Sequence, residues 1–100
     1  MEDGLDPLIH PLPRLRICAL LDPVTQETFG AIRDLLGLSD ATLSKHVRTL
    51  VDAGYLEPTN AQRSGRRPVS LRLTPGGRTA FHRHVAALTG LTGPVQEEQE

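Results

Sequence analysis

The chain has 100 residues, a net charge of -1 and only three aromatic side chains, which limits it to one small domain with a modest, mostly aliphatic core. Its single cysteine excludes an intrachain disulfide bond. Because we find no apolar run long enough to span a membrane and no secretory signal sequence, we expect a cytoplasmic protein with no membrane partner.

The N-terminal part of the chain predicts a loose segment followed by a helix. Residues 1–6 are acidic and contain a glycine, which is typical of a flexible terminus. A helix is expected to begin near Pro11 or Pro13, because proline suits the first helical turn, and to end at Asp22 before Pro23. Its buried face is expected to comprise Leu12, Leu15, Cys18 and Ala19.

A second helix is predicted from about Thr28 to Leu36. Thr28 is a candidate N-cap, and Gly37 is placed to adopt the left-handed conformation that ends many helices. Residues 24–27 before this helix are expected to form a short strand or a turn. The apolar stripe of the second helix comprises Phe29, Ile32, Leu35 and Leu36.

A third helix is predicted to begin at Ser39, which is a strong N-cap, and to stop at Gly54. His46 lies at the edge of its apolar face, where a packed or hydrogen-bonded histidine is favoured over one that contacts a partner. Only residues 37–39 separate the second helix from the third, as in the turn of a helix-turn-helix. The buried face of the third helix is expected to comprise Leu43, Val47 and Leu50.

Two strands with a basic loop between them follow the third helix. Residues 55–57 are predicted to form one strand, and residues 69–73 alternate apolar and polar side chains as a half-buried strand does. These segments predict a hairpin with a long polar tip at residues 59–68. The tip carries one glycine and three arginines: Gly65, Arg63, Arg66 and Arg67.

A fourth helix is predicted to begin at Thr74 and Pro75, which suit the N-cap and the first helical position. Gly90 and the Gly93-Pro94 pair are expected to end it. Its apolar face comprises Phe81, Val85 and Leu88.

The order of these elements predicts an α+β, mostly helical fold. It is the order of a winged helix-turn-helix, with a three-helix core, a two-stranded β-wing and a C-terminal dimerisation helix. We expect the winged-helix domain to occupy residues 7–90, with dimerisation helices at both of its ends. Residues 91–100 are expected to form an acidic C-terminal tail.

Basic residues are concentrated in the part of the chain that contains the third helix and the hairpin. Residues 29–84 carry nine basic and four acidic side chains, a local net charge of +5, and the flanking residues carry a net charge of -6. A phosphate-binding surface needs local rather than overall positive charge. The overall charge of -1 therefore does not exclude a nucleic-acid partner.

Three segments resemble a known family. They are similar to winged-helix transcriptional regulators of the MarR/ArsR-like group, and they comprise residues 9–17, residues 43–56 and residues 73–78. The middle segment contains the sequences Leu-Ser-Lys-His-Val and Ala-Gly-Tyr-Leu. The resemblance covers residues 7–90 and is to the short, stand-alone, single-domain type. It implies sequence-specific binding of double-stranded DNA as a homodimer, with the third helix (residues 39–53) in the major groove and the hairpin as a wing.

The predicted DNA contacts lie on the outward face of the third helix and in the wing. Small side chains let a helix approach base edges closely, and arginine suits a narrow, electronegative minor groove. Thr42, Ser44 and Lys45 are the candidates for base or near-base contacts. The alternative for this helix face, and for the wing, is an ordinary solvated surface. The full predicted DNA-binding set is Ser39, Ala41, Thr42, Ser44, Lys45, Arg48, Arg63, Arg66 and Arg67.

The first and fourth helices carry more apolar surface than a monomer of this size needs. A homodimer with two-fold symmetry would match a palindromic operator, and repression is the expected mode of regulation. The alternative is that some of these side chains cover the monomer core. The candidate dimer interface comprises Leu8, Ile9, Leu12, Phe81, Val85, Leu88 and Leu91.

Other kinds of chemistry have weaker support. His82 and His84 are two residues apart, so on a helix they point to different sides and cannot easily bind one metal ion. Cys18 on an apolar helix face favours an inert buried thiol over a redox switch. We expect no cofactor and no enzymatic activity, because phosphate-loop and nucleophile-elbow motifs are missing. A small-molecule effector would have to bind at the dimer interface.

The competing interpretation is a protein–protein docking or dimerisation module that does not bind DNA. Winged helices also serve that purpose. The basic side chains on the third helix and in the wing argue for DNA instead.

Overall fold

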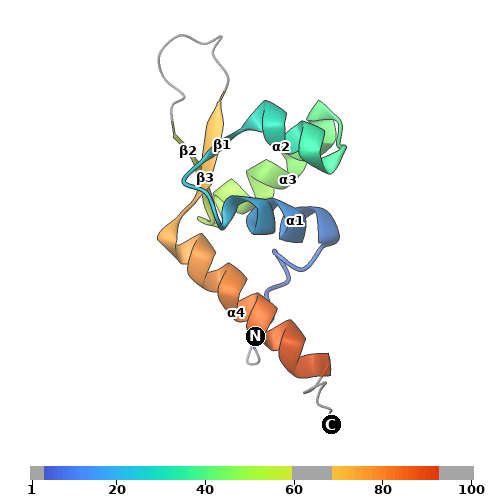
Figure 1. Ribbon diagram of the computed structural model, residues 1–100, viewed down its shortest axis with the longest axis vertical. Helices are drawn as coiled ribbons and strands as arrows, with labels where there is room; N and C mark the ends of the chain where they lie inside the picture. Colours follow the sequence, from blue (N-terminus) through green and yellow to red (C-terminus); the bar gives the residue numbers. More distant parts are fainter. Residues whose placement is uncertain (1–3, 60–68, 93–100) are drawn as a thin grey trace.

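The computed structural model describes residues 4–59 and 69–92. Its elements follow the predicted order, as Figure 1 shows. They are α1 (Leu12–Leu21), β1 (Glu27–Thr28), α2 (Phe29–Leu36), α3 (Asp40–Asp52), β2 (Leu56–Pro58), β3 (Ser70–Leu73) and α4 (Pro75–Thr92). The expected α+β winged-helix architecture is therefore confirmed.

Helix α1 begins and ends as predicted, but its buried face is different. Pro11 precedes the helix and Asp22 follows it, whereas Leu12 is 55% exposed and Ala19 is also exposed. The inward face is centred on Ile17 and not on Leu15. At about 100 degrees per residue, Leu12 and Ala19 lie on the opposite side of the helix from Ile17 and point away from the core. The fully buried side chains of α1 are Ile17, Cys18 and Leu21.

Helix α2 confirms both predicted ends. The Thr28 hydroxyl accepts a hydrogen bond from the Ala31 amide at 3.1 Å, and Gly37 adopts a left-handed conformation with φ of 68°. Ile32 is fully buried, but Leu35 is 66% exposed. Leu35 stands at the edge of the apolar stripe, and the packing of α2 against α1 leaves it in solvent, so its predicted burial was wrong.

Helix α3 also begins and ends where the sequence predicts. The Ser39 hydroxyl accepts a hydrogen bond from the Thr42 amide at 3.1 Å, and Gly54 follows the helix with φ of 82°. Leu43 and Leu50 are fully buried and Val47 is partly buried. The turn between α2 and α3 is therefore the short turn of a helix-turn-helix.

The sheet has three strands, one more than the predicted two-stranded wing. Its order is β1-β3-β2, and both pairings are antiparallel. Glu27 of β1 lies opposite Leu71, and Leu56 of β2 lies opposite Leu73. Strand β3 has two hydrogen-bonding edges, and the segment before α2 is placed to use the second one. Of the predicted hairpin tip at residues 59–68, residues 60–68 lie outside the described residues.

Helix α4 begins at the predicted cap and passes the first predicted stop, Gly90, while its last described residue, Thr92, directly precedes the second, the Gly93-Pro94 pair. Thr74 accepts a hydrogen bond from the Gly77 amide at 2.9 Å. The helix then runs through Gly90 to Thr92, because a glycine inside an exposed helix costs only about 1 kcal/mol. In Figure 1, the C-terminal half of α4 extends beyond the other helices. Val85 is 40% exposed, so the predicted apolar face is only partly covered.

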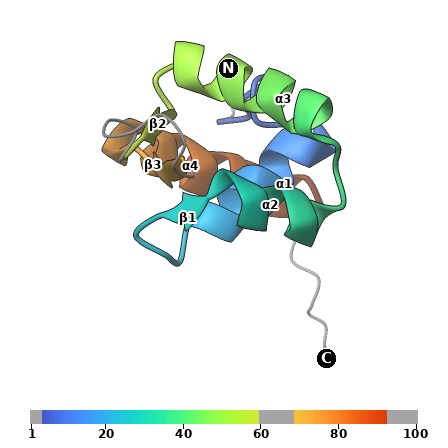
Figure 2. The same ribbon diagram turned by 90° about the horizontal axis from the view of Figure 1, so that it is seen from above.

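The core is aliphatic, as the composition predicts. Seen from above, α3 runs along one side of the molecule, and the sheet lies near its C-terminal end (Figure 2). This arrangement leaves one whole face of α3 uncovered. The buried apolar side chains are Ile9, Ile17, Cys18, Leu21, Ile32, Leu43, Leu50, Leu56, Leu71, Leu73 and Phe81.

Candidate nucleic-acid interface

The outward face of α3 carries small, polar and basic side chains, with the acidic Asp52 at its C-terminal end. It lies opposite Leu43 and Leu50, which anchor the helix in the core. The five side chains predicted to face outward on this helix are all exposed: Ala41, Thr42, Ser44, Lys45 and Arg48. The structure therefore presents them together on one accessible surface.

The first turn of α3 is held by its own hydroxyl groups. Ser39 accepts from the Thr42 amide and donates its hydroxyl proton to Thr42 Oγ1 at 3.0 Å. Ser39 is therefore occupied as a cap. Thr42 Oγ1 accepts that hydrogen bond, so the Thr42 hydroxyl can still donate its own hydrogen bond to an external acceptor.

Arg33 connects the two helices of the helix-turn-helix, and sequence reasoning missed it. Its guanidinium donates to Asp34 and, across the turn, to Asp40 in the first turn of α3, both at 2.9 Å. These two hydrogen bonds raise the pKa of Arg33. Two carboxylates share this one guanidinium, so the pairing reduces the negative charge at the start of α3 without cancelling it. A separation of seven residues across a turn is no recognisable signal in a sequence.

His46 joins α3 to α1. Arg14 Nη1 lies 3.0 Å from His46 Nδ1, and Arg14 Nε donates to the Leu8 carbonyl oxygen at 2.6 Å. Because arginine can only donate, His46 Nδ1 is the acceptor, and the neutral ring carries its proton on Nε2. Burial first, and then the charges of Arg14 and Lys45, lower the pKa of His46. The predicted hydrogen-bonded histidine is thus confirmed.

Of the basic residues in the predicted wing, only those at its base lie in the described part of the chain. Arg63, Arg66 and Arg67, predicted as wing contacts, lie outside the described residues. At the base of the wing, Arg72 pairs with Glu57 on the neighbouring strand at 2.6 Å. The charge of Arg72 is therefore already matched within the sheet.

The candidate dimer interface divides into buried and exposed residues. Ile9 and Phe81 belong to the core of the single chain, so they are not surface residues as an interface role requires. Leu8, Leu12, Val85 and Leu91 are exposed. Leu88 is partly buried.

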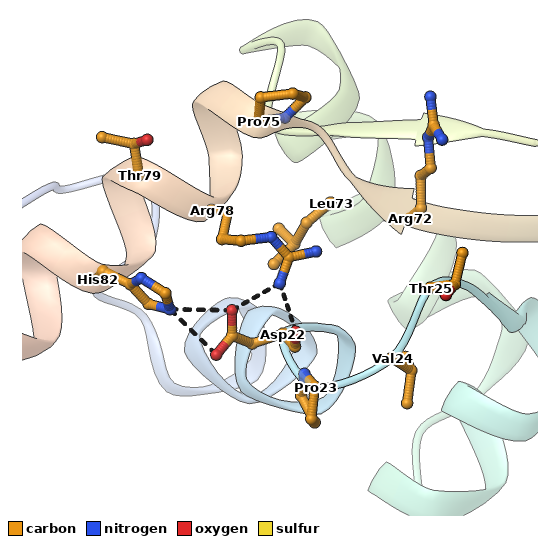
Figure 3. Close-up of a pocket in the computed structure, with 10 residues that line it drawn as sticks. All are labelled: Asp22, Pro23, Val24, Thr25, Arg72, Leu73, Pro75, Arg78, Thr79 and His82. Carbon is orange, nitrogen blue, oxygen red and sulfur yellow. Dashed lines mark hydrogen bonds and ion pairs between the residues drawn. The ribbon is translucent and has the colours of Figure 1, made fainter.

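An open pocket of about 740 Å³ lies between the end of α1, strand β3 and the start of α4 (Figure 3). The Asp22 carboxylate accepts from Arg78 Nη1 at 2.8 Å and lies 2.9 Å from His82 Nε2. The hydrogen bond with His82 is the main reason why the pKa of Asp22 is lowered. None of the pocket-lining residues belongs to α3. These polar groups link α1 to α4 by binding one another.

The weaker alternatives can also be placed in the structure. His82 pairs with Asp22 at the surface, while His84 is buried, so the two histidines face different surroundings. Within residues 4–59 and 69–92, no three histidine, cysteine or acidic side chains are grouped to hold a metal ion. Burial, reinforced by Asp6 and Asp22, raises the pKa of Cys18 to about 12, which keeps the thiol protonated.

Comparison with known proteins identifies the family. A family model described as a winged helix DNA-binding domain matches residues 14–92. The chain belongs to this winged-helix family. An uncharacterised protein of Methanocaldococcus jannaschii is 25% identical over 89 residues, which make up 89% of this chain and 97% of that protein.

Solved structures share the winged-helix fold. A transcriptional regulator homologue from Pyrococcus horikoshii OT3 superposes with a TM-score of 0.76 at 23% identity, covering 85% of this chain and 84% of that one. A MarR family transcriptional regulator from Silicibacter pomeroyi gives a TM-score of 0.64 at 20% identity, covering 78% of this chain and 54% of that one. In the described part of this winged-helix chain, no helix is long and apolar enough to cross a membrane.

Proposed function

We propose that this winged-helix protein is a homodimeric transcriptional repressor that reads a palindromic site in double-stranded DNA. Helix α3 enters the major groove, and the loop at residues 59–68 contacts the backbone or the minor groove. The observation that carries this proposal is the uncovered face of α3, where small polar side chains adjoin Lys45 and Arg48.

The shape of that face suits a groove. Ala41, Thr42 and Ser44 are too short to hold the helix away from base edges. Lys45 is long enough to reach a guanine edge or a phosphate. Arg48, one turn later, is placed for the DNA backbone.

The electrostatics of α3 support the same orientation. Asp40 lies near the end of α3 that approaches DNA, and its carboxylate is paired with Arg33. Asp52 lies at the far end of the helix. The ion pair with Arg33 reduces the repulsion between Asp40 and DNA phosphates.

A second copy of the chain is the proposed partner for the exposed apolar side chains near the start of α1 and along α4. This surface comprises Leu8, Leu12, Val85, Leu88 and Leu91, of which Leu88 is partly buried in the single chain. A two-fold axis through it would present two α3 helices to half-sites about one helical turn apart. Such an arrangement requires a palindromic operator.

Selection of bound sequences from a random duplex pool tests the proposal. The expected result is a short palindromic consensus whose binding weakens as salt is raised. Replacing Lys45 with alanine should cost about 1–3 kcal/mol at one base position and relax the consensus there. Arg83→Ala removes an exposed positive charge from α4 and is the matched control, expected to keep the consensus.

Two other results would contradict the proposal in different ways. No enrichment from the pool would favour the protein-docking interpretation. A consensus that Lys45→Ala and Arg83→Ala alter equally would show that α3 does not read the bases. Repression itself is read from a reporter gene that carries the selected site.

A further inference from the structure

Hydrogen bonds connect four residues in series: Tyr55, Asp6, His84 and His10. The Asp6 amide lies 2.9 Å from His84 Nδ1, and His84 Nε2 lies 3.3 Å from His10 Nδ1. The Tyr55 hydroxyl donates to Asp6 Oδ2 at 2.5 Å. His84 has no exposed surface at all, whereas His10 reaches solvent.

The partners of His84 determine where its proton lies. The Asp6 backbone amide can only donate, so His84 Nδ1 must be an acceptor. In a neutral ring, Nε2 then carries the proton and donates it to His10 Nδ1. Both ring nitrogens of this buried histidine are satisfied only in that one neutral form.

An additional proton cannot be placed on the His84 ring without breaking a hydrogen bond. A proton on His84 Nδ1 would face the N–H of Asp6. Two donors would then confront each other at a fully buried ring, which is costly.

The charged and titratable groups around His84 reinforce this preference. Burial first, and then the neighbouring His10, lower the pKa of His84, and the Asp6 carboxylate opposes them only in part. That carboxylate is already bound by the Leu8 amide and the Tyr55 hydroxyl. Tyr55 stays protonated, because its hydrogen bond to Asp6 raises its pKa to about 12. Cys18 also lies near enough to interact with Asp6.

The four residues come from three separate parts of the fold. Asp6 and His10 belong to the segment before α1, and His84 belongs to α4. Tyr55 directly follows α3: its amide donates to the Leu50 carbonyl, and its own carbonyl accepts from the Thr74 amide at 3.0 Å. The chain of hydrogen bonds therefore connects the end of α3 to α4 through the N-terminal segment.

We propose that His10 and His84 form an acid-sensitive latch that holds the N-terminal segment on α4 and steadies α3, so that acidification releases it and weakens DNA binding. This inference rests on the proposed function, because DNA binding is the activity that the latch regulates. The same residues also lie close to the proposed dimer surface at Leu8 and Val85. Release of the segment would loosen both surfaces together.

The direction of the expected effect separates the latch from simple electrostatics. Acidification makes any protein more positive, which by itself strengthens binding to DNA. The latch predicts the opposite: weaker binding as the pH falls below the ordinary histidine value of 6.5. One pH unit below that value allows a change of about tenfold in the ratio of closed to open latch. The affinity for DNA can fall by up to that factor, because it follows the fraction of protein in which the latch is closed.

Two measurements on the whole protein test the latch. Nitrogen NMR of the histidine rings, without DNA, should show His84 with its proton on Nε2 at pH 7.5. On acidification, the Asp6 amide and Tyr55 signals should move with the same midpoint as His84. Binding to the selected duplex is then compared at pH 7.5 and 5.5 at equal ionic strength. The variants are His84→Gln, which cannot be protonated, and His82→Gln as the exposed control on the same helix.

The expected result is that wild type and His82→Gln lose affinity at pH 5.5 while His84→Gln does not. If wild-type affinity rises on acidification, or if His84→Gln loses as much as wild type, the latch is wrong. The NMR titration needs no variant and no DNA: if the Asp6 amide and Tyr55 signals do not move with His84, the latch is wrong even where His84→Gln fails to fold. A protein that binds no DNA at any pH would refute the proposed function, and a His84 ring protonated on Nδ1 at pH 7.5 would refute the latch separately.

Discussion

Three histidines of this chain show how one side chain takes different roles from its surroundings. His46 accepts a hydrogen bond from Arg14, His82 pairs with Asp22 at the surface, and His84 is buried between a backbone amide and another imidazole. Helical spacing correctly separates His82 from His84. It does not name their partners, which come from α1 and from the segment before it.

Two glycines of α4 are predicted to respond differently to substitution by alanine. A Cβ at Gly77 would overlap the Tyr55 carbonyl oxygen, whereas a Cβ at Gly90 meets nothing within 4 Å. Gly77→Ala should therefore destabilise the fold by about 1–3 kcal/mol. Gly90→Ala, the control, should stabilise it by about 0.5–1 kcal/mol, because alanine favours a helix.

Urea unfolding at a single protein concentration measures both glycine variants. Equal stability of Gly77→Ala and wild type would show that α4 does not approach the end of α3 as closely as the structure has it.

At the scale of elements, polar contacts between helix ends set how the helices are joined. Thr28, Ser39 and Thr74 cap their own helices. Arg33 then ties α2 to α3, and Asp22 ties the end of α1 to the start of α4. The capping contacts are local and predictable, whereas the ties between helices depend on the packing.

The tie at Asp22 predicts a pH dependence of stability. Its folded-state pKa is lowered from 3.8, mainly by the hydrogen bond with His82, so the ionised carboxylate stabilises the fold above that pH. This stabilisation is lost as the pH falls through the folded-state value. Asp22→Asn should therefore lower the melting temperature at pH 7, and its difference from wild type should shrink below about pH 4.

Thermal unfolding followed by circular dichroism from pH 7 to pH 3 measures this effect. Asp52→Asn changes an exposed carboxylate at the C-terminal end of α3 and is the control, expected not to lower the melting temperature at pH 7. A constant gap between Asp22→Asn and wild type across the pH range would contradict the ionic role of Asp22.

At the scale of the whole molecule, the distribution of exposed apolar side chains points to assembly. The C-terminal half of α4 extends away from the body of the fold (Figure 1), and Leu91 on it is 68% exposed. A domain this small has little stability to spare. Covering this surface with a second copy would add apolar burial that a single chain lacks.

Disruption of the proposed dimer surface tests this idea. Val85→Glu combined with Leu91→Glu should shift the protein from dimer to monomer in analytical ultracentrifugation, because burying the new carboxylates without partners is costly. Leu35→Glu changes an equally exposed leucine on α2, outside the proposed surface, and should leave the dimer intact. A wild-type protein that sediments as a monomer would remove the basis for a palindromic site.

The sequence by itself determined the order of the elements, the caps at Thr28, Ser39 and Thr74, and the outward face of α3. These features depend on residues within one or two helical turns of each other, so periodicity and capping chemistry reveal them. Local rules went wrong where a neighbour decided the outcome: Leu12 and Leu35 face solvent, and Gly90 does not end its helix.

Only the tertiary structure decided that β1 joins the sheet, that Ile9 and Phe81 belong to the core, and that Arg33, Asp22 and His84 join separate elements. The partners of His84 show why: Asp6 lies 78 positions away in the chain, and packing alone brings the two together. A hydrogen bond between such distant groups leaves no periodic pattern in the sequence, since it forms only after the helices have docked.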